Sequence, residues 1–253
     1  MKIIQPTYLS AAIFTGMLTM GAPVCAETQE KTNKPSIVTG HNVVDAVDDL
    51  RETTADLIGA MLEAEEGFAF NGWKEKEAQL VRMEQGLQRM ERVLDEKAEA
   101  TDSSWLNWLE DRDYSVTVKE QISTLANTLN EMASMLQEAK QSPNPQVIVG
   151  HNLVDQVDDV RETTADLLQA LGDAGPEWGW FDDEDRFSAA LAKLDEMEQV
   201  LDRKAEMTDA EWEAFVASPE YRVSIHDNIN TLANMLNNMS DMVAGEGRVT
   251  QID

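Results

Sequence analysis

Apolar residues recur along this chain in alternating steps of about three and four residues, which is the spacing of one face of an α-helix. Such apolar seams run through three consecutive segments: Val43, Val47, Leu50, Thr54, Leu57, Met61; then Leu80, Met83, Leu87, Met90, Leu94; then Ile122, Leu125, Leu129, Met132, Leu136. The sequence lacks the strict alternation typical of strands. We therefore predict an all-α fold in which these seams pack against other helices.

The chain is internally repeated. Gly40–Leu57 returns nearly unchanged as Gly150–Leu167, and Thr124–Asn127 returns as Thr231–Asn234. The seams return as well: Leu153, Val157, Val160, Thr164, Leu167, Leu171; then Phe187, Ala190, Leu194, Met197, Leu201; then Ile229, Leu232, Leu236, Met239, Val243. This pattern predicts a tandem duplication of an antiparallel three-helix unit, as residues 37–140 and 147–243. The two copies form either two small bundles or one six-helix body.

Helix-breaking residues separate these segments. Residues 141–146 contain two prolines and predict a linker between the copies. Glycines at Gly67–Gly72 and Gly172–Gly179 predict the end of the first helix in each copy. Thr101 and Thr208 are expected to cap a short helical turn with aromatic side chains, between the second and third helices.

The first residues predict a targeting signal. A basic start, an apolar stretch and a small-residue ending at Ala26 indicate a cleavable signal peptide over residues 1–26 and export to the periplasm. Secretion and a lipid anchor at Cys25 are the alternatives, although Val24 is not the small residue that lipid attachment favours. Residues 27–36 are expected to be a flexible segment and 244–253 a tail. No other segment predicts stable membrane insertion.

Acidic residues dominate the charge: 48 Asp and Glu oppose 20 Lys and Arg, for a net charge of −28. Nucleic acid is excluded as a partner, because phosphate binding depends on Lys and Arg. A basic protein or a cation is compatible with this charge. The simplest interpretation is that the charge maintains solubility.

The first helix of each copy contains the candidate site, because its polar positions also match between the copies. A divalent cation is the one cofactor considered, with the candidate ligands His41, Asp45, Asp48, Asp49, Glu52, His151, Asp155, Asp158, Asp159 and Glu162. The sequence holds no EF-hand loop and no zinc-protease motif, so a solvated acidic face is the competing interpretation. A partner surface is predicted at Asp56, Asp166, Trp178, Trp180 and Phe181.

The sequence holds no recognisable catalytic motif. The first hypothesis is a non-enzymatic, acidic periplasmic interaction or binding protein. The alternative is a protein that binds or buffers divalent cations through the His, Asp and Glu face of the first helix of each repeat. An enzyme with a carboxylate site between the repeats is held in reserve, and the pattern leaves the oligomeric state and the arrangement of the repeats open.

Overall fold

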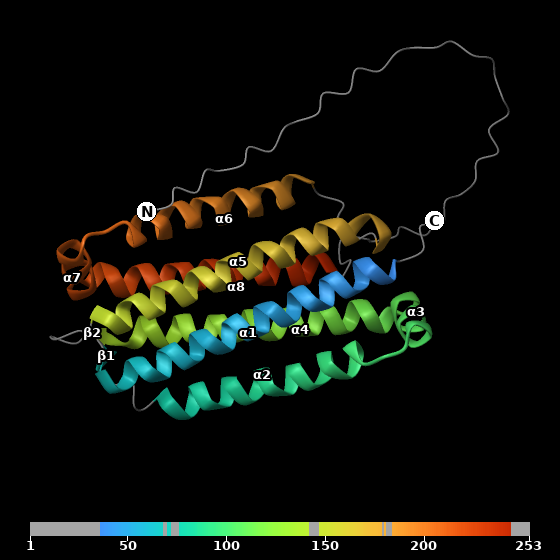
Figure 1. Cartoon of the computed structure of the whole chain (residues 1–253), viewed down its shortest axis with the longest axis horizontal. Coiled ribbons are helices and arrows are strands. Elements are labelled where there is room, and N and C mark those ends of the chain that lie inside the picture. Colours follow the sequence, from blue (N-terminus) through green and yellow to red (C-terminus); the bar gives the residue numbers. More distant parts are fainter. Residues whose placement is uncertain are drawn as a thin grey trace, which may run out of the picture. The chain divides into compact units, whose positions relative to one another are not determined.

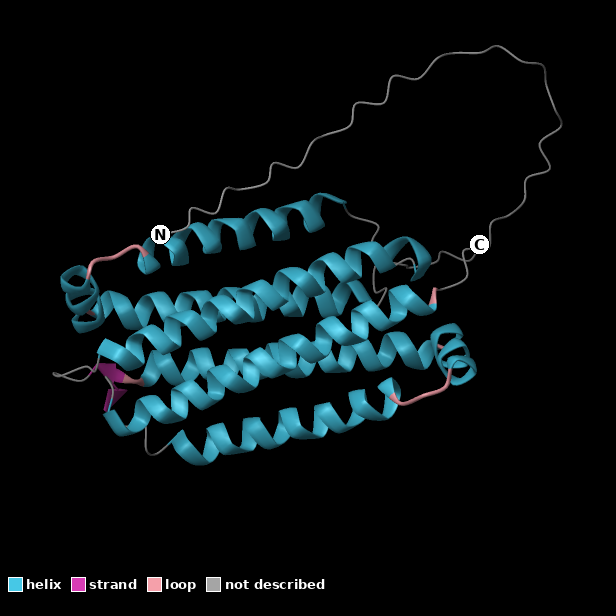
Figure 2. Cartoon of the chain, viewed as in Figure 1, coloured by secondary structure: helices cyan, strands magenta, loops and turns pink. Residues whose placement is uncertain are grey.

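The computed structural model describes residues 36–67, 70–71, 76–141, 147–178, 180 and 184–243, all within one compact unit, Asn33–Asp253. The helices are α1 (Ile37–Gly67), α2 (Glu77–Ala98), α3 (Asp102–Glu110), α4 (Arg112–Glu138), α5 (Val147–Trp178), α6 (Glu184–Ala205), α7 (Asp209–Ala217) and α8 (Pro219–Val243) (Figures 1 and 2). Two short strands, β1 (Phe70–Asn71) and β2 (Lys140–Gln141), pair antiparallel. The all-α prediction is confirmed as a helical bundle. The predicted signal peptide, most of the flexible segment, the linker prolines and the tail lie outside the described residues.

The most extensive packing joins helices of different sequence repeats: α4 packs on α8, and α1 packs on α5. In Figure 1, α6, α5, α1 and α2 lie side by side, with α8 and α4 behind α5 and α1. The helices α3 and α7 lie at the bundle ends, against α4 and α8 respectively. The described helices therefore form one packed body instead of two separate bundles.

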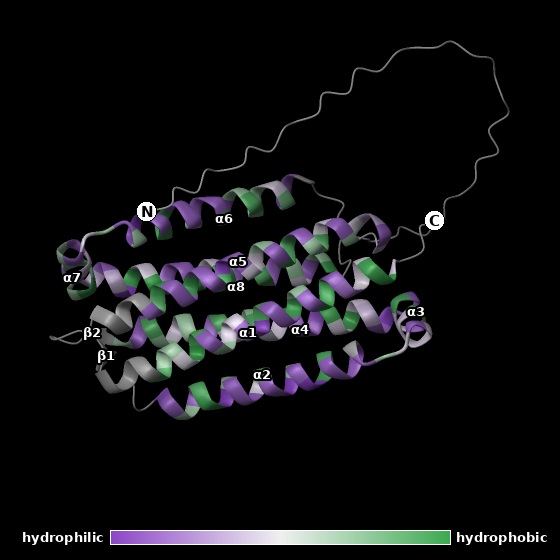
Figure 3. Cartoon of the chain, in the orientation of Figure 1, coloured by the Kyte–Doolittle hydropathy of each residue, from purple (hydrophilic) through white to green (hydrophobic). Residues whose placement is uncertain are grey.

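The predicted seams make up the core of this body. All six seam residues of α1 are buried, as are all six of α5 and the seams of α2, α4 and α8. In α6 only Leu194, Met197 and Leu201 are buried, while Phe187 and Ala190 pack partly buried at its edge. Each fully buried Leu, Val or Met contributes roughly 1.5–3 kcal/mol relative to an exposed side chain. The exposed faces are strongly polar, as Figure 3 shows for α2 and α6.

The two corners between the long helices follow the predicted capping pattern. Thr101 accepts a hydrogen bond from the Ser104 backbone N–H, and Thr208 forms a capping box with Glu211. Both expected helical turns are confirmed as the helices α3 and α7. In the first corner the Tyr114 hydroxyl donates to the Gly40 carbonyl at 3.0 Å, which ties α4 to the start of α1.

The first helix of the second repeat ends within the predicted segment Gly172–Gly179, but only at its far end. α5 continues through Gly172 and Pro176 to Trp178. Gly172 has a packing role, since a Cβ there would lie 2.7 Å from Cζ of Phe187 in α6. Pro176 stands in the last turn, where stacking of Trp178 on Tyr114 holds the helix end in place. Tertiary packing thus overrides the local breaking signal.

None of the helices in the described part of the chain is both long and apolar enough to cross a bilayer.

Candidate functional site

The candidate site begins with the spacing of carboxylates on α1 and α5. Each carboxylate stands three or four residues from the next, so on a helix they share the side opposite the apolar seam. The following residues are exposed and are called here the acidic crossing: Asp45, Asp49, Glu52 and Asp56 of α1, with Asp155, Asp159, Glu162 and Asp166 of α5.

Thr53 and Thr163 mark the point where α1 and α5 cross. Their Oγ1 atoms lie 2.8 Å apart, and each hydroxyl also lies within hydrogen-bond distance of carbonyls of its own helix. Thr53 and Thr163 occupy the same position in the two sequence repeats. The acidic faces of α1 and α5 therefore meet about a centre of local twofold character.

This arrangement places carboxylates of the two helices near one another. Asp49 is exposed overall, but partial burial of its carboxylate is the largest cause that raises its pKa, followed by the charges of Asp48, Asp45 and Glu52 on α1 and of Asp166 on α5. The pKa of Asp159 is raised in the same way, by burial, then by Asp158, Asp155 and Glu162, and by Asp56 across the crossing. Like charges from both helices thus accumulate around the two threonines.

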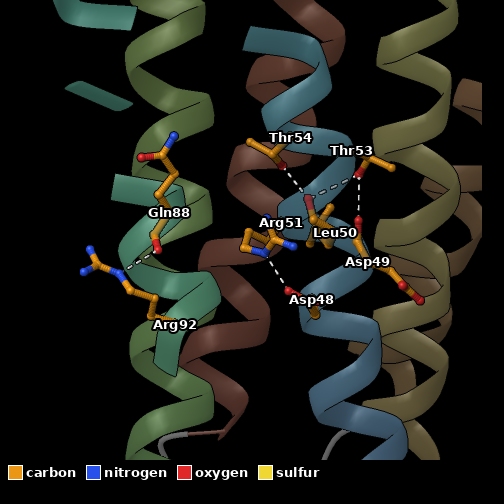
Figure 4. A network of polar contacts seen from close by, with 8 residues as sticks. All are labelled: Asp48, Asp49, Leu50, Arg51, Thr53, Thr54, Gln88 and Arg92. Atoms are coloured by element: carbon orange, nitrogen blue, oxygen red, sulfur yellow. Dashed lines mark hydrogen bonds and ion pairs between the residues drawn. The ribbon is translucent and has the colours of Figure 1, made fainter. Parts of the chain in front are cut away.

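Asp48 and Asp158 have a different role from the carboxylates of the acidic crossing. Asp48 accepts a hydrogen bond from Nε of Arg51 at 2.5 Å, and Asp158 accepts one from Nε of Arg161 at 2.6 Å. Figure 4 shows the Arg51–Asp48 pair on one side of α1, and Thr53 with Asp49 on the side toward α5. These two candidate metal ligands are therefore engaged in ion pairs within the bundle.

The arginines extend these ion pairs to the flanking helices. Arg161 is only 8% exposed, and its Nη1 lies 3.9 Å from Oε2 of Glu198 in α6. Arg51 interacts electrostatically with Glu91, which occupies the corresponding position in α2. These arginines therefore neutralise Asp48 and Asp158 and attach the outer helices to the inner ones.

A groove adjoins the acidic crossing between α1, α2 and α5. Its described lining residues are Ala55, Asp56, Gly59, Ala60, Glu84, Asn152, Asp155 and Gln156. Small residues of α1 keep the groove open, while Asp56, Glu84 and Asp155 bring three carboxylates to its walls. Glu84 and Gln156 were missed by the sequence analysis, because their place at the groove depends on which helices pack together.

The one candidate histidine whose side chain the structure describes, His41, does not join these carboxylates. The imidazole of His41 lies 3.7 Å from the Trp105 ring, centroid to centroid, at the end of the bundle where α3 packs. The side chain of His151 lies outside what the structure describes. No group of three or more His, Cys, Asp and Glu residues that could hold a metal ion occurs among the described residues.

The predicted aromatic partner surface lies largely inside the protein. Trp180 is only 6% exposed, stacks on Tyr114 and Trp178, and donates its indole N–H to Oγ of Ser115 at 3.3 Å. Trp180 is therefore not available as part of an exposed partner surface, because the first repeat supplies the Tyr114 ring and the Ser115 hydroxyl that cover it. Trp178 is half-buried against the same core, and Phe181 lies outside the described residues. Asp56 and Asp166 remain exposed.

Comparison with known proteins does not assign this chain to a family. No protein-family model matches this sequence, and no curated protein or solved structure is significantly similar to it.

Proposed function

We propose that this protein is a non-enzymatic, acidic binding protein, built as a tandem of two three-helix units, whose acidic crossing takes a cationic partner. The observation that carries this proposal is the meeting of like charges from equivalent helices. Asp49 lies under the influence of Asp166, and Asp159 under that of Asp56, so each repeat contributes to the same charged face. Such repulsion is relieved when a positively charged partner binds.

The length of the acidic crossing favours a basic protein over a single ion as its partner. On α1, Asp45 and Asp56 are separated by eleven residue steps, or roughly 16 Å at the rise of an α-helix. Exposed carboxylates spread over that length match an extended segment with several Lys or Arg side chains. A single divalent ion instead needs several oxygen ligands within about 2.0–2.6 Å.

A divalent-cation-binding or buffering role is the second candidate, and the groove favours it. Asp56, Glu84 and Asp155 line it from three helices, although at their described positions they do not form a ready metal-binding group. Oxygen ligands of this kind suit Mg²⁺, Ca²⁺ or Mn²⁺. This candidate predicts saturable binding of the ion, whereas a solubilising charge predicts none.

We further propose that the protein acts in the periplasm after export. The support is the sequence of residues 1–26, with its basic start, apolar stretch and small residues before Glu27. Mass spectrometry of the protein recovered from an exported fraction tests this. A mature chain that begins at Glu27 is expected, and a recovered chain that retains residues 1–26 would contradict export by cleavage.

The binding proposal is tested by calorimetric titration of the protein with a lysine-rich peptide, and separately with Mg²⁺, Ca²⁺ and Zn²⁺. The site variant is D49N/D56N/D159N/D166N, which removes four charges at the acidic crossing. The matched control is E96Q/E99Q/E206Q/E213Q, which removes the same number of exposed charges outside α1 and α5. Both variants have the same net charge, so they separate a local site from a general charge effect.

We expect the peptide to bind the native chain and the control alike, with affinity that falls as salt rises. The site variant should bind at least about tenfold more weakly, which corresponds to about 1.4 kcal/mol. Equal weakening in both variants would contradict a site at the acidic crossing. Saturable binding of a metal ion that is lost in the site variant alone would favour the second candidate instead.

A further inference from the structure

We propose that the α1–α4 face of the first repeat and the α5–α8 face of the second form an exchangeable interface, so that two copies of this chain can form a swapped dimer. In this dimer each first repeat packs on the second repeat of the partner copy. The inference concerns self-association and is independent of the cationic partner.

The packing between the repeats supports this proposal. The two most closely packed helix pairs, α1 with α5 and α4 with α8, each join one repeat to the other. The buried core spans both repeats, with Leu50, Ile122, Val160 and Ile229 all fully buried. Neither repeat therefore covers its own apolar face, and each needs the other as a partner.

Polar contacts make this interface specific. Besides the Thr53–Thr163 pair, Oγ of Ser123 lies 2.6 Å from Oγ of Ser240 between α4 and α8. Arg222 of α8 donates to the Leu136 carbonyl at 2.8 Å, near the end of α4. These contacts fix the register of both antiparallel helix pairs, so a second repeat from another copy would meet the same complementary groups.

A single short segment of the chain joins the two repeats. The chain passes from Gln141 to Val147 through a short sequence that includes Pro143 and Pro145. Every described contact between the repeats within one chain is also available between two chains in the swapped dimer. The main difference in free energy is therefore the entropy of association, which high protein concentration offsets. Repulsion between Asp49 and Asp166 opposes the closed interface most at low salt, where opening is expected to be fastest.

Disulfide trapping at the helix crossing distinguishes the swapped dimer from the closed chain. Two full-length variants, T53C and T163C, are made in a Cys25→Ala background, mixed at high concentration and low salt, and then oxidised. In a closed chain, where both repeats of one copy pack on each other, the new cysteine of each variant faces a threonine. Only a swapped dimer places Cys at position 53 of one copy against Cys at position 163 of the other, at the close approach that a disulfide needs.

We expect the mixture to give a covalent species of twice the chain mass, containing one copy of each variant. Its yield should be several-fold above that of a mixed S134C and S188C control, where both residues are exposed and report random collisions. The double variant T53C/T163C at high dilution should cross-link within one chain, which verifies the closed geometry.

Three results would overturn the proposal. The first is a yield no higher than that of the collision control, while the dilute double variant cross-links normally. The second is a covalent dimer of the T53C chain alone, because it requires first repeat on first repeat. The third is failure of the dilute double variant to cross-link, because the pairing on which the proposal depends would then be absent.

Discussion

Thr53 and Thr163 are the same residue of two sequence repeats, and their hydroxyl oxygens lie 2.8 Å apart. Both hydroxyls also lie near carbonyls one turn back in their own helices. Because each hydroxyl has one proton, one threonine donates across the crossing, and the other accepts this bond and donates to its own helix. A surface that meets its own equivalent at one residue pair is self-complementary. The interface between the repeats therefore resembles that of a symmetric dimer contained within one chain.

Replacing either threonine by valine should weaken the α1–α5 pair modestly. Thr53→Val keeps the shape of the side chain and removes one partly buried hydrogen bond, so the free energy of unfolding should fall by about 0.5–1.5 kcal/mol. Thr163→Val should cost a similar amount. Urea denaturation of both single variants and the double variant measures these changes.

The double variant isolates the contact between the two threonines. Because they touch, the double change should cost less than the sum of the single changes, with a coupling energy of about 0.5 kcal/mol or more. T117V, which removes an exposed hydroxyl on α4, is the control and should change the free energy of unfolding little. Strict additivity would indicate that the hydroxyl pair contributes nothing to the crossing.

The raised pKa values of Asp49 and Asp159 predict an unusual pH dependence. A folded-state pKa above the ordinary value of 3.8 means that the folded chain binds these protons more tightly than the unfolded chain. The two carboxylates therefore destabilise the fold at neutral pH. This penalty is relieved as the pH falls through the raised values, and it is absent below 3.8.

The variant D49N/D159N tests this sign. It should have a higher Tm than the native chain at pH 7, and the difference should shrink as the pH is lowered toward 3.8. The variant E96Q/E206Q removes as many exposed charges away from α1 and α5 and corrects for net charge. A Tm difference that does not depend on pH after this correction would show that the pKa values of Asp49 and Asp159 are not raised in the folded chain.

The helical class and most of the core could be predicted from the sequence, because each seam follows a local rule of spacing. The helix against which each seam packs could not be predicted in this way. Val44 and Ile58 of α1 lie beside its seam and are buried, as are Val154 and Leu168 of α5. The burial of these extra positions shows that α1 and α5 are covered from several sides. Periodicity alone does not say which helix covers them.

The sequence predicted which carboxylates belong to the candidate site, but not how those of α1 and α5 are brought together. Spacing on one helix placed the carboxylates on a common face, and their exposure agrees with that. The approach of Asp49 to Asp166 depends on the crossing of two helices far apart in the sequence. His41 lay in the same motif, but its ring packs on Trp105. An aromatic corner brought in by tertiary packing could not be deduced from helix spacing.

Two glycines in α1 should respond in opposite ways to alanine. A Cβ at Gly40 would lie 2.4 Å from Cδ2 of the buried Leu109, so Gly40→Ala should destabilise the chain by about 1–3 kcal/mol through overpacking. A Cβ at Gly59 meets no atom within 4 Å, so Gly59→Ala should stabilise by about 0.5–1 kcal/mol through helix propensity. Thermal melts followed by circular dichroism compare the two. Stabilisation by both changes would show that Leu109 moves aside at little cost.

Arg161 should control how firmly α6 is attached to α5. This residue is 8% exposed, and its guanidinium connects Asp158 of α5 with Glu198 of α6. Arg161→Met keeps most of the apolar stem but leaves Asp158 without its ion-pair partner, so the free energy of unfolding should fall by about 1–3 kcal/mol. The matched change Arg89→Met affects an exposed arginine of α2 and should stay within about 0.5 kcal/mol of the native value.

Hydrogen exchange locates the effect of Arg161→Met within the fold. Few side chains of α6 are buried, and its main packing partner is α5, so loss of the bridge should speed amide exchange in α6 more than in α8. The seam residues Leu194, Met197 and Leu201 should still hold the helix in place, which limits the change to faster local opening. Equal acceleration in α6 and α8 would mean that Arg161 supports the whole bundle and not the attachment of one helix.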